Sequence, residues 1–360
     1  MRIFLTGTTG YVGKHLLRYL LIARFPVTVC IRSKKGLGGK QRFDIEIASD
    51  FLFRHLITTG VSVVEKDVND LVKEDLSGCD TVIHCAANVK FTSSMEELMK
   101  ENVFALQKIY GLSSGMRFVY ISTCYVHPKK SKIRKAEKIE SGLVSSDFIC
   151  NYAYTKYLAE EFLYSQKKDI DILRLSCVGA PLEKLPPMRG GAHLSIGEAI
   201  LRSSIPEVWA PPNLIFSVVP VDIVCREIIN TLNTSEKKIK QICASSHSKT
   251  YNVSFKNFIN SEMMELSNIY MDISFEEFES RIAKRYWMFP STYKKIIDIN
   301  RTISFVSDNI SFESDTCIPE IGAENYENIT LNYIKLLILT KPNKLTLQNF
   351  LYQILIPIIP

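Results

Sequence analysis

The stretch Thr6–Gly13, TGTTGYVG, follows a short apolar run and opens an amphipathic segment over residues 13–24. A glycine-rich turn between a strand and a helix is the setting in which a helix N-terminus binds phosphate groups. Gly7 permits the tight turn, Gly10 lets the backbone approach a pyrophosphate, and Gly13 allows close packing of helix on strand. The spacing therefore predicts a dinucleotide-binding loop, in which the further contacts are Thr9, Tyr11 and Val12.

Short apolar runs and segments of helical periodicity alternate over the first 150 residues. The runs are RIFLTG, VTVCIRS, VSVVEKDV, DTVIHCAA and RFVYISTCYV, and the helical periodicity covers residues 13–24, 93–110 and 152–166. Continuous apolar runs of this kind are typical of parallel strands that are buried on both faces and joined by crossover helices. We therefore expect an α/β fold, a doubly wound parallel sheet of the Rossmann type.

The second half of the chain indicates a smaller lobe. A further strand, IDILRLSCVG, leads into the proline-rich APLEKLPPMRGG, which can continue neither a helix nor a central strand. The stretch FSVVPVDIVCREIINTL then predicts a short strand and a helix that begins near Asp222. We expect a cofactor domain over residues 1–250, with a substrate-covering segment at about 180–215, and a small, mainly helical region over residues 251–360.

The composition is that of an ordinary folded protein, with 46% hydrophobic and 23% charged residues. The net charge of +6 is spread along the chain, which favours an anionic small molecule over nucleic acid as the partner. The nine cysteines form no CxxC pair, so we expect reduced thiols and no zinc site. A strand that begins at Arg2 leaves no room for a signal peptide, so the five Asn-x-Ser/Thr sites are expected to be unglycosylated.

The C-terminal run LTLQNFLYQILIPIIP is apolar but contains Asn349 and Gln353 and is broken by Pro357. It is shorter than the roughly 20 residues that a spanning helix needs. Core packing or a homodimer contact is the favoured interpretation, and shallow attachment to a membrane is the alternative. We expect an intracellular protein, in the cytoplasm or peripheral on the membrane of the endoplasmic reticulum or peroxisome.

The second predicted strand ends in VCIRSKK, where an NAD-specific protein usually carries an acidic residue that binds the ribose hydroxyls. Arg32 stands there instead, with Lys34 and Lys35 after it. A guanidinium can pair with a 2′-phosphate through two parallel hydrogen bonds, whereas an acid would repel that phosphate. The pattern favours NADPH as the cofactor, and a solvated basic turn is the alternative.

Asp67 and Val68 follow the third predicted strand, VSVVEK. From the carboxyl end of that strand, Asp67 could hold the adenine amino group of the cofactor, with Val68 beside it. It could equally cap the helix that comes next. The sequence leaves both interpretations open.

Tyr152 and Lys156 stand four residues apart in NYAYTKYLAEEF, so both side chains project from one face of a predicted helix. A neighbouring ammonium lowers the pKa of a phenol by favouring the phenolate, and we expect Lys156 to act in this way on Tyr152. The pair alone is common, and an exposed helical pair is the alternative. Thr123 ends the preceding predicted strand, at the edge where doubly wound sheets bind ligands, and its hydroxyl can bond the substrate oxygen. Thr123, Tyr152 and Lys156 are the predicted catalytic group, whereas Ser122 and Tyr154 should point elsewhere. Tyr152 and Lys156 are also expected to contact the cofactor, where the lysine can hold the nicotinamide ribose.

These motifs together resemble the extended short-chain dehydrogenase/reductase superfamily over roughly the first 250 residues. The strings that carry the resemblance are TGTTGYVG with its GxxGxxG spacing, HCAA, the Thr123 region and YAYTK. Within that superfamily the chain is most similar to the fatty acyl-CoA reductases, also called the male-sterility group. The supporting strings are IRSKKGLGGKQRF, VIHCAANVKF, ISTCYVHP, RLSCVGAPLEKLPP and VVPVDIV.

The resemblance implies roles for individual residues. The loop glycines would bind the pyrophosphate, Arg32 the 2′-phosphate, and Ala86 and Ala87 the ribose side of the cofactor. Asn102, in ENVFAL, would support the active site. The chain also departs from the family pattern. No proline follows the arginine of RLS, the stretch before Tyr152 is short, the glycine-tryptophan turn after LPP is missing, and the match beyond residue 255 is faint.

The resemblance further implies NADPH-dependent reduction of a long-chain fatty acyl-CoA thioester to an aldehyde or alcohol, with Tyr152 as the proton donor. An oxidoreductase or epimerase acting on a hydroxysteroid or nucleotide sugar would use the same residues. A non-catalytic NADP(H)-binding protein is the third interpretation. The complete catalytic group favours an enzyme.

Overall fold

The structure is a computed structural model in which contacts divide the chain into two compact units. The first unit is Met1–Val178, Val219–Ser246 and Ser311–Ile318, and the second is Gly179–Val218, His247–Ile310 and Pro319–Pro360. The segments of the two units alternate along the chain. The division into a cofactor domain over residues 1–250 and a C-terminal region over residues 251–360 stays a prediction. The structure describes residues 1–48, 53, 56–57, 60–131, 133–166, 170–185, 188, 190–201, 206–210, 215–234, 238–244, 248, 252–254, 268–305, 311–316, 318, 321 and 323–340.

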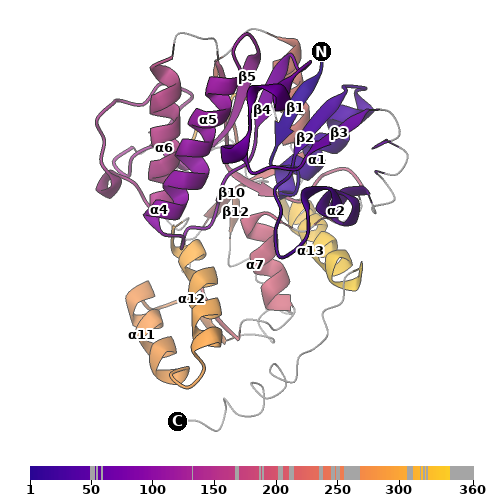
Figure 1. Cartoon of the computed structure of the whole chain (residues 1–360). Helices are drawn as coiled ribbons and strands as arrows, with labels where there is room; N and C mark the ends of the chain where they lie inside the picture. The colour runs from indigo at the N-terminus through magenta and orange to yellow at the C-terminus, as the bar shows by residue number, and fades with distance from the viewer. Residues whose placement is uncertain are drawn as a thin grey trace. The chain divides into compact units, whose positions relative to one another are not determined.

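A seven-stranded sheet with the order β11-β7-β5-β4-β1-β2-β3 forms the centre of the first unit (Figure 1). Each neighbouring pair in it is parallel. This arrangement confirms the predicted doubly wound sheet. The chain direction across the sheet reverses between β1 and β4, and ligands bind at the carboxyl ends of strands at such a switch point. The strands are β1 (Ile3–Thr6), β2 (Val27–Cys30), β3 (Val61–Val64), β4 (Thr81–His84), β5 (Arg117–Thr123), β7 (Ile170–Leu175) and β11 (Ile239–Ile242).

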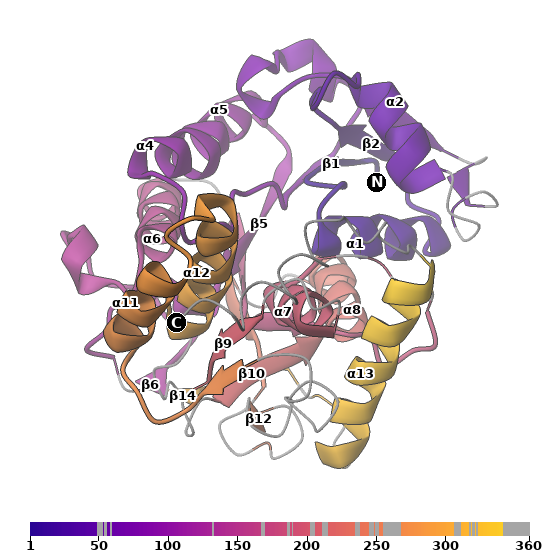
Figure 2. The same ribbon diagram turned by 90° about the horizontal axis from the view of Figure 1, so that it is seen from below.

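The helices of the first unit lie where the periodicity predicts them. Helix α1 (Tyr11–Ile22) follows the glycine turn, and α6 (Asn151–Tyr164) carries the tyrosine-lysine pair. The segment predicted as one helix over 93–110 is α4 (Met95–Leu98), a π-helical stretch η5 (Met99–Phe104) and α5 (Ala105–Leu112) in succession. Ser94 begins this run, because its hydroxyl accepts a hydrogen bond from the backbone N–H of Glu97. Figure 2 shows α4, α5 and α6 on one side of the sheet and α1 on the other.

The core between the sheet and helices α5 and α6 explains why these elements stay together. Phe4, Val82 and Phe118 project from three adjacent strands and belong to one buried cluster with Leu106 of α5 and Leu163 of α6. Burying a side chain of this size contributes about 1.5–3 kcal/mol. The cluster thereby holds helix α6, which carries Tyr152 and Lys156, against the strands whose ends carry the candidate site.

Shorter elements complete the first unit, and one further helix packs against α1. That helix is α8 (Val221–Asn233), which follows β10 (Ile215–Pro220) as the sequence predicts. The remaining short elements are α2 (Gly39–Phe43), η1 (Asp44–Ala48), η3 (Val68–Asp70), η4 (Lys73–Leu76), η6 (Cys124–Val126), β6 (Ile133–Arg134), η7 (Ser145–Asp147), β8 (Cys177–Gly179) and β14 (Ser311–Phe312).

The second unit is mainly helical. Helix α7 (Ala192–Leu201) packs against α13 (Ala323–Thr340), and α11 (Phe275–Arg285) packs against α12 (Pro290–Phe305). Strand β9 (Glu207–Trp209) pairs in parallel with β13 (Asn268–Tyr270), and β12 (Asn252–Ser254) pairs antiparallel with β10. Among the residues that the structure describes, no helix is both long and apolar enough to cross a membrane. The C-terminal run LTLQNFLYQILIPIIP lies outside the described residues.

Candidate functional site

The glycine loop between β1 and α1 is sterically restricted at two of its three glycines. Gly7 has a φ of 79°, and a Cβ on it would lie 2.7 Å from the backbone of Cys85 and Ala86. A Cβ on Gly13 would lie 2.2 Å from the carbonyl oxygen of Gly7. Gly10 is less crowded, since a Cβ there would meet only the Gly7 oxygen, at 3.2 Å. The loop therefore packs tightly on the end of β4 and leaves Gly10 accessible to a ligand.

Helix α1 begins in a way that suits an anion. Its N-cap is Gly10, which offers no side-chain cap, and no acidic residue lies in the first turn. The positive end of the helix dipole and its backbone N–H groups therefore meet no negative side chain from the first turn of the helix itself. A pyrophosphate fits this cradle.

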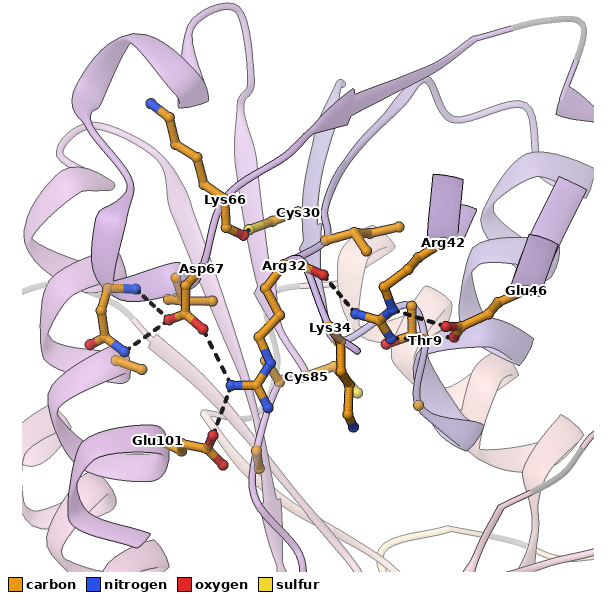
Figure 3. A pocket seen from close by; sticks show the side chains of 18 of the residues that line it. Thr9, Cys30, Arg32, Lys34, Arg42, Glu46, Lys66, Asp67, Cys85 and Glu101 are labelled. Carbon is orange, nitrogen blue, oxygen red and sulfur yellow. Dashed lines mark hydrogen bonds and ion pairs between the residues drawn. The ribbon is translucent and has the colours of Figure 1, made fainter. Parts of the chain in front are cut away.

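A cavity of about 500 Å³ opens beside the loop within the first unit (Figure 3). Its volume lies in the range of small-molecule and cofactor sites. It brings together predicted cofactor residues from the ends of β1, β2, β3 and β4, whereas Tyr11, Val12 and Gly13 do not line it. The predicted residues among its lining are Gly7, Thr9, Gly10, Arg32, Asp67, Val68, Ala86 and Ala87.

Arg32 does not extend alone into the cavity. Its Nη1 atom lies 2.7 Å from Oε1 of Glu101 and 3.3 Å from Oδ2 of Asp67. Figure 3 shows the guanidinium pointing toward both carboxylates. The hydrogen bond to Glu101 raises the pKa of Arg32. Asp67 also accepts hydrogen bonds from the backbone and side chain of Asn69, so it caps the short helix η3. Asp67 therefore caps the next helix, one of the two roles expected from the sequence, and it also lines the cavity.

Several residues that line this cavity were not predicted from the sequence, among them Glu101, Arg42 and Cys85. Glu101 stands directly before Asn102 and pairs with a residue 69 positions away, so no local pattern points to it. Arg42 donates a hydrogen bond to the carbonyl oxygen of Arg32 at 2.7 Å and pairs with Glu46. Cys85, in the HCAA string, lines the cavity. For Arg42, its position in a basic segment after the second strand was the available signal.

The structure brings the three members of the predicted catalytic group to one strand end. Thr123 is the last residue of β5, and its hydroxyl donates a hydrogen bond to the carbonyl oxygen of Leu175 at 3.3 Å and lies close enough to Tyr152, in the first turn of α6, to lower the pKa of its phenol. The Nζ atom of Lys156 donates a hydrogen bond to the carbonyl oxygen of Ile121 at 2.7 Å. It lies 4.1 Å from the ring centroid of Tyr120. Tyr152 and Lys156 are both buried, so the pair is not the exposed helical pair of the alternative.

Burial dominates the protonation of this group. It raises the pKa of Tyr152 well above the usual value for a phenol, and the Thr123 hydroxyl only partly opposes the shift. Burial also lowers the pKa of Lys156 to about 7. The expected lowering of the Tyr152 pKa by Lys156 is wrong for this structure, because the lysine is directed to the Ile121 carbonyl and the phenolate would be desolvated. The phenol therefore carries its proton at neutral pH, although burial also makes it a weaker acid.

Ser122 and Tyr154 point away from the predicted catalytic group, as expected from the sequence. The Ser122 hydroxyl donates a hydrogen bond to Oε1 of Glu160 at 2.5 Å, on the side of the strand opposite the Thr123 hydroxyl. Tyr154 stacks with Tyr157 and packs against Phe148, away from the catalytic group.

Comparisons with known proteins place this geometry in a family. The family model described as male sterility protein, an NAD-binding domain, matches residues 5–228. The chain belongs to the male sterility protein family. Fatty acyl-CoA reductase 1 of Xenopus laevis is 30% identical over 277 residues, which are 62% of this chain and 52% of that protein. The chain thus spans about half the length of the curated relatives that it matches. The predicted resemblance to this group is confirmed.

Solved structures with similar folds support the architecture of this male sterility family member. The terminal R domain of the myxalamid biosynthetic pathway has a TM-score of 0.70 at 18% identity, over 94% of this chain and 90% of that one. MoeE5 in complex with UDP-glucuronic acid and NAD has a TM-score of 0.61 at 17% identity, over 93% and 99%. These similarities show the fold, and the NAD-binding family model indicates a nicotinamide dinucleotide as the class of cofactor.

Asn102 connects the elements around the site in this family member. Its amide nitrogen donates to the carbonyl oxygen of Asn88 and to the Thr155 hydroxyl, at 3.0 and 3.2 Å. Its amide oxygen accepts from the Asn88 backbone N–H at 2.7 Å. The side chain therefore ties the loop after β4 to α6, one residue before Lys156. In the described part of the chain, no three His, Cys, Asp or Glu side chains gather to hold a metal ion.

A fully buried ion pair anchors the helix that carries Tyr152 and Lys156. Glu160 lies one turn after Lys156, and Arg174 of β7 reaches it at 2.6 Å, with both side chains inaccessible to solvent. Tyr164 donates a further hydrogen bond to Glu160 at 2.6 Å. Although burial opposes ionisation, Arg174 lowers the pKa of Glu160 below its usual value. The pair is therefore charged, and removing one partner leaves the other charge buried alone.

We expect Glu160→Gln to lower the free energy of unfolding by about 3–5 kcal/mol, the usual cost of breaking a buried ion pair from one side. Urea denaturation monitored by circular dichroism measures it. Glu140→Gln is the matched control, because Glu140 pairs with Lys130 at the same distance of 2.6 Å on the exposed surface. That control should show no measurable change. Equal stabilities of the two variants would contradict the structural role given to Glu160.

Proposed function

We propose that this chain is an NADPH-dependent oxidoreductase that reduces a fatty acyl-CoA thioester, with Tyr152 as the proton donor. One observation carries the proposal. β4 and β5 are neighbouring parallel strands, so Cys85, which follows β4 and lines the cavity beside the glycine loop, lies next to the end of β5 that carries Thr123. The phosphate cradle and the catalytic group therefore adjoin at the end of β4, as transfer between a dinucleotide and a substrate requires.

The residues of the chain have separable tasks in this proposal. The glycine loop and the α1 N-terminus hold the pyrophosphate, Asp67 and Val68 hold the adenine end, and Ala86 and Ala87 face the ribose. When bound, the dinucleotide supplies a hydride. Thr123 and Tyr152 bind the carbonyl oxygen of the substrate, and Tyr152 gives its proton to the oxyanion that develops there. The thiol then leaves as the hemithioacetal collapses, and an aldehyde results; a second reduction gives the alcohol.

Consumption of NADPH in the presence of palmitoyl-CoA tests the proposal. We expect oxidation of NADPH that depends on the thioester, and mass spectrometry should find the aldehyde or alcohol and free coenzyme A. Purified protein that binds NADPH tightly but turns over no acyl-CoA of any chain length would refute the substrate. Turnover of a nucleotide sugar or hydroxysteroid in the same assay would assign the chain to the alternative class.

The preference for NADPH rests on positive charge at the end of β2. Arg32, Lys34, Lys35 and Arg42 line the cavity there. Glu101 opposes them, since its carboxylate holds Arg32 and adds negative charge near the proposed 2′-phosphate site. We therefore expect Glu101→Gln to tighten binding of NADPH about fivefold and to leave NADH nearly unchanged, the upper range for an exposed ion pair.

Isothermal titration with adenosine 2′,5′-bisphosphate and with 5′-AMP isolates this effect from the chemistry. Glu97→Gln is the control, because Glu97 lies on the adjoining helix α4 and does not line the cavity. Equal changes for both nucleotides, or a change that the control reproduces, would show that Glu101 does not influence the 2′-phosphate.

The pKa of Lys156 predicts a pH dependence of the reaction. Because burial brings that pKa to about 7, the side chain is an ammonium below this pH and an amine above it. Although its hydrogen bond goes to the Ile121 carbonyl, the ammonium places a positive charge one helical turn from Tyr152, which favours an oxyanion there, so kcat/KM for reduction should fall as the pH rises through about 7. Lys156→Arg keeps the charge at every pH in the assay. We expect its profile to be flat across this range, and a falling limb that persists in this variant must come from another group.

Four further features of the chain are proposed on the sequence alone. They concern the preference for long acyl chains, a homodimer, and location in the cytoplasm or on the membrane of the endoplasmic reticulum or peroxisome. The substrate-covering role of residues 180–215 is likewise proposed. Product analysis after incubation with mixed acyl-CoA chain lengths addresses the first of them.

A further inference from the structure

The turn between α11 and α12 exposes two large apolar side chains next to each other. Trp287 is 71% exposed and Met288 is 58% exposed, whereas Ile282 and Tyr286 just before them are fully buried. Figures 1 and 2 both show α11 and α12 side by side as a hairpin. The turn forms the end of this hairpin.

The turn is held in place, so its exposed side chains are not the result of a loose segment. The Tyr286 hydroxyl donates a hydrogen bond to Oε1 of Glu207 in β9 at 3.0 Å, and Arg285 pairs with the same carboxylate at 3.2 Å. The backbone N–H of Phe289 donates to the carbonyl oxygen of Tyr286 at 2.9 Å. These bonds fix the buried side of the turn and direct Trp287 and Met288 outward.

The second tryptophan of the chain shows what the ordinary environment would be. Trp209 is only 7% exposed, and its indole N–H donates to the carbonyl oxygen of Ile273 at 2.9 Å. Trp287 has no such environment, and a bare indole ring in water forgoes the free energy that its burial would contribute. An exposed Trp-Met pair at a fixed position therefore indicates a surface that another phase or molecule covers.

Charge around the turn is positive, and it is segregated along the hairpin. Lys284, Lys294 and Lys295 flank the turn, are exposed, and form no ion pair with the residues that the structure describes. The acidic residues of α11 lie in its first half, where Glu277 pairs with Arg281 and Glu279 with Arg301. The end of the hairpin thus combines an indole ring, a thioether and three lysines.

We propose that the α11–α12 turn docks on the surface of a lipid bilayer that contains anionic lipids. Tryptophan prefers the level of the headgroups, where its ring is apolar and its N–H meets polar groups. The lysines can extend toward lipid phosphates while their methylenes cover the apolar side chains. A protein partner fits less well, because two side chains at a turn offer far less than the roughly 800 Å² per partner of a stable interface. The proposal does not depend on which reaction the site performs.

Sedimentation of the full chain with vesicles tests the proposal. We expect binding to vesicles of phosphatidylcholine mixed with phosphatidylserine, weak binding to phosphatidylcholine alone, and release by added salt. Trp287→Ser with Met288→Ser should weaken binding to the anionic vesicles at least about tenfold, since both apolar anchors are lost. Val144→Ser, which removes an exposed apolar side chain of the first unit, is the control and should bind like the unchanged protein.

A second variant keeps the test decisive if the serine variant folds poorly. Replacing Lys284, Lys294 and Lys295 by Gln should weaken binding to anionic vesicles at least about tenfold and should not affect urea denaturation. Two results would overturn the proposal. One is that the unchanged protein does not bind anionic vesicles, or that both variants bind them as well as the unchanged protein does. The other is self-association in the ultracentrifuge that the serine variant abolishes without any vesicle binding, which would assign the turn to a protein contact.

Discussion

Replacing Tyr152 by Phe is expected to lower turnover with acyl-CoA by about 10²- to 10⁴-fold, the usual contribution of a positioned proton donor, while NADPH binding is unchanged. The phenol lies beside the Thr123 hydroxyl at the end of β5, and burial keeps it protonated. Phenylalanine retains the ring that packs edge-on against Phe91, with 5.4 Å between the ring centroids. The variant therefore loses the acidic proton and little of the packing.

The control for this variant lies one turn further along the same helix. Tyr157 is as buried as Tyr152, but its hydroxyl donates to Glu161 and to the carbonyl oxygen of Glu140, away from the catalytic group. Tyr157→Phe should lower stability slightly and leave turnover near that of the unchanged protein. Steady-state kinetics measures turnover of the two variants, and fluorescence titration with NADPH measures their binding of the cofactor. If Tyr152→Phe turned over within a few-fold of the unchanged protein, Tyr152 would not be the proton donor.

The sheet could be predicted from the sequence because its signals are local. Each buried strand is a continuous apolar run, and each predicted helix has boundaries within two residues of those in the structure. The glycine loop was equally readable, since strand, turn and helix follow one another directly. Where strands run parallel, their carboxyl ends meet at one edge. The sequence alone therefore predicts Thr123, Tyr152 and the glycine loop at one site.

The charges and their partners could not be predicted in this way. Arg32 pairs with Glu101, and Glu160 with Arg174, across sequence separations that carry no periodic signal. The pKa of Tyr152 illustrates the same limit. Helical spacing correctly placed Lys156 near the tyrosine, but the sign of the pKa shift depends on burial and on where the ammonium points. Both are properties of the packed structure.

Unit 2 was the hardest part to anticipate for a related reason. Trp209 and Trp287 both stand beside apolar residues in the sequence, yet Trp209 is buried, with its indole N–H bonded to the Ile273 carbonyl oxygen, and Trp287 is exposed. A tryptophan in an apolar segment is normally assigned to the core. Only the fold reveals that the α11–α12 turn directs Trp287 outward.

The glycine loop yields the second large prediction, in which two alanine substitutions should separate folding from binding. Gly13→Ala should lower the free energy of unfolding by about 3 kcal/mol or more, because its Cβ would lie 2.2 Å from the Gly7 carbonyl oxygen and backbone would have to move. Gly10 has an ordinary φ of −83°, and a Cβ there would meet the Gly7 carbonyl oxygen at 3.2 Å, a tight contact that needs a much smaller shift than the one at Gly13. Gly10→Ala should therefore lose much less stability than Gly13→Ala and bind NADPH about tenfold more weakly, since Gly10 lines the cavity where the pyrophosphate would approach the backbone.

Urea denaturation and NADPH titration of both variants measure the two effects independently. If Gly13→Ala were as stable as the unchanged protein, the close contact between α1 and the loop would not be as the structure has it. If Gly10→Ala bound NADPH normally, the pyrophosphate would not approach the backbone at this residue. Because the two glycines lie only three positions apart in one turn, a shared loss of both properties would argue against assigning them separate roles. If Gly13→Ala loses mainly stability and Gly10→Ala loses mainly NADPH binding, the same short loop serves the fold through Gly13 and the cofactor through Gly10.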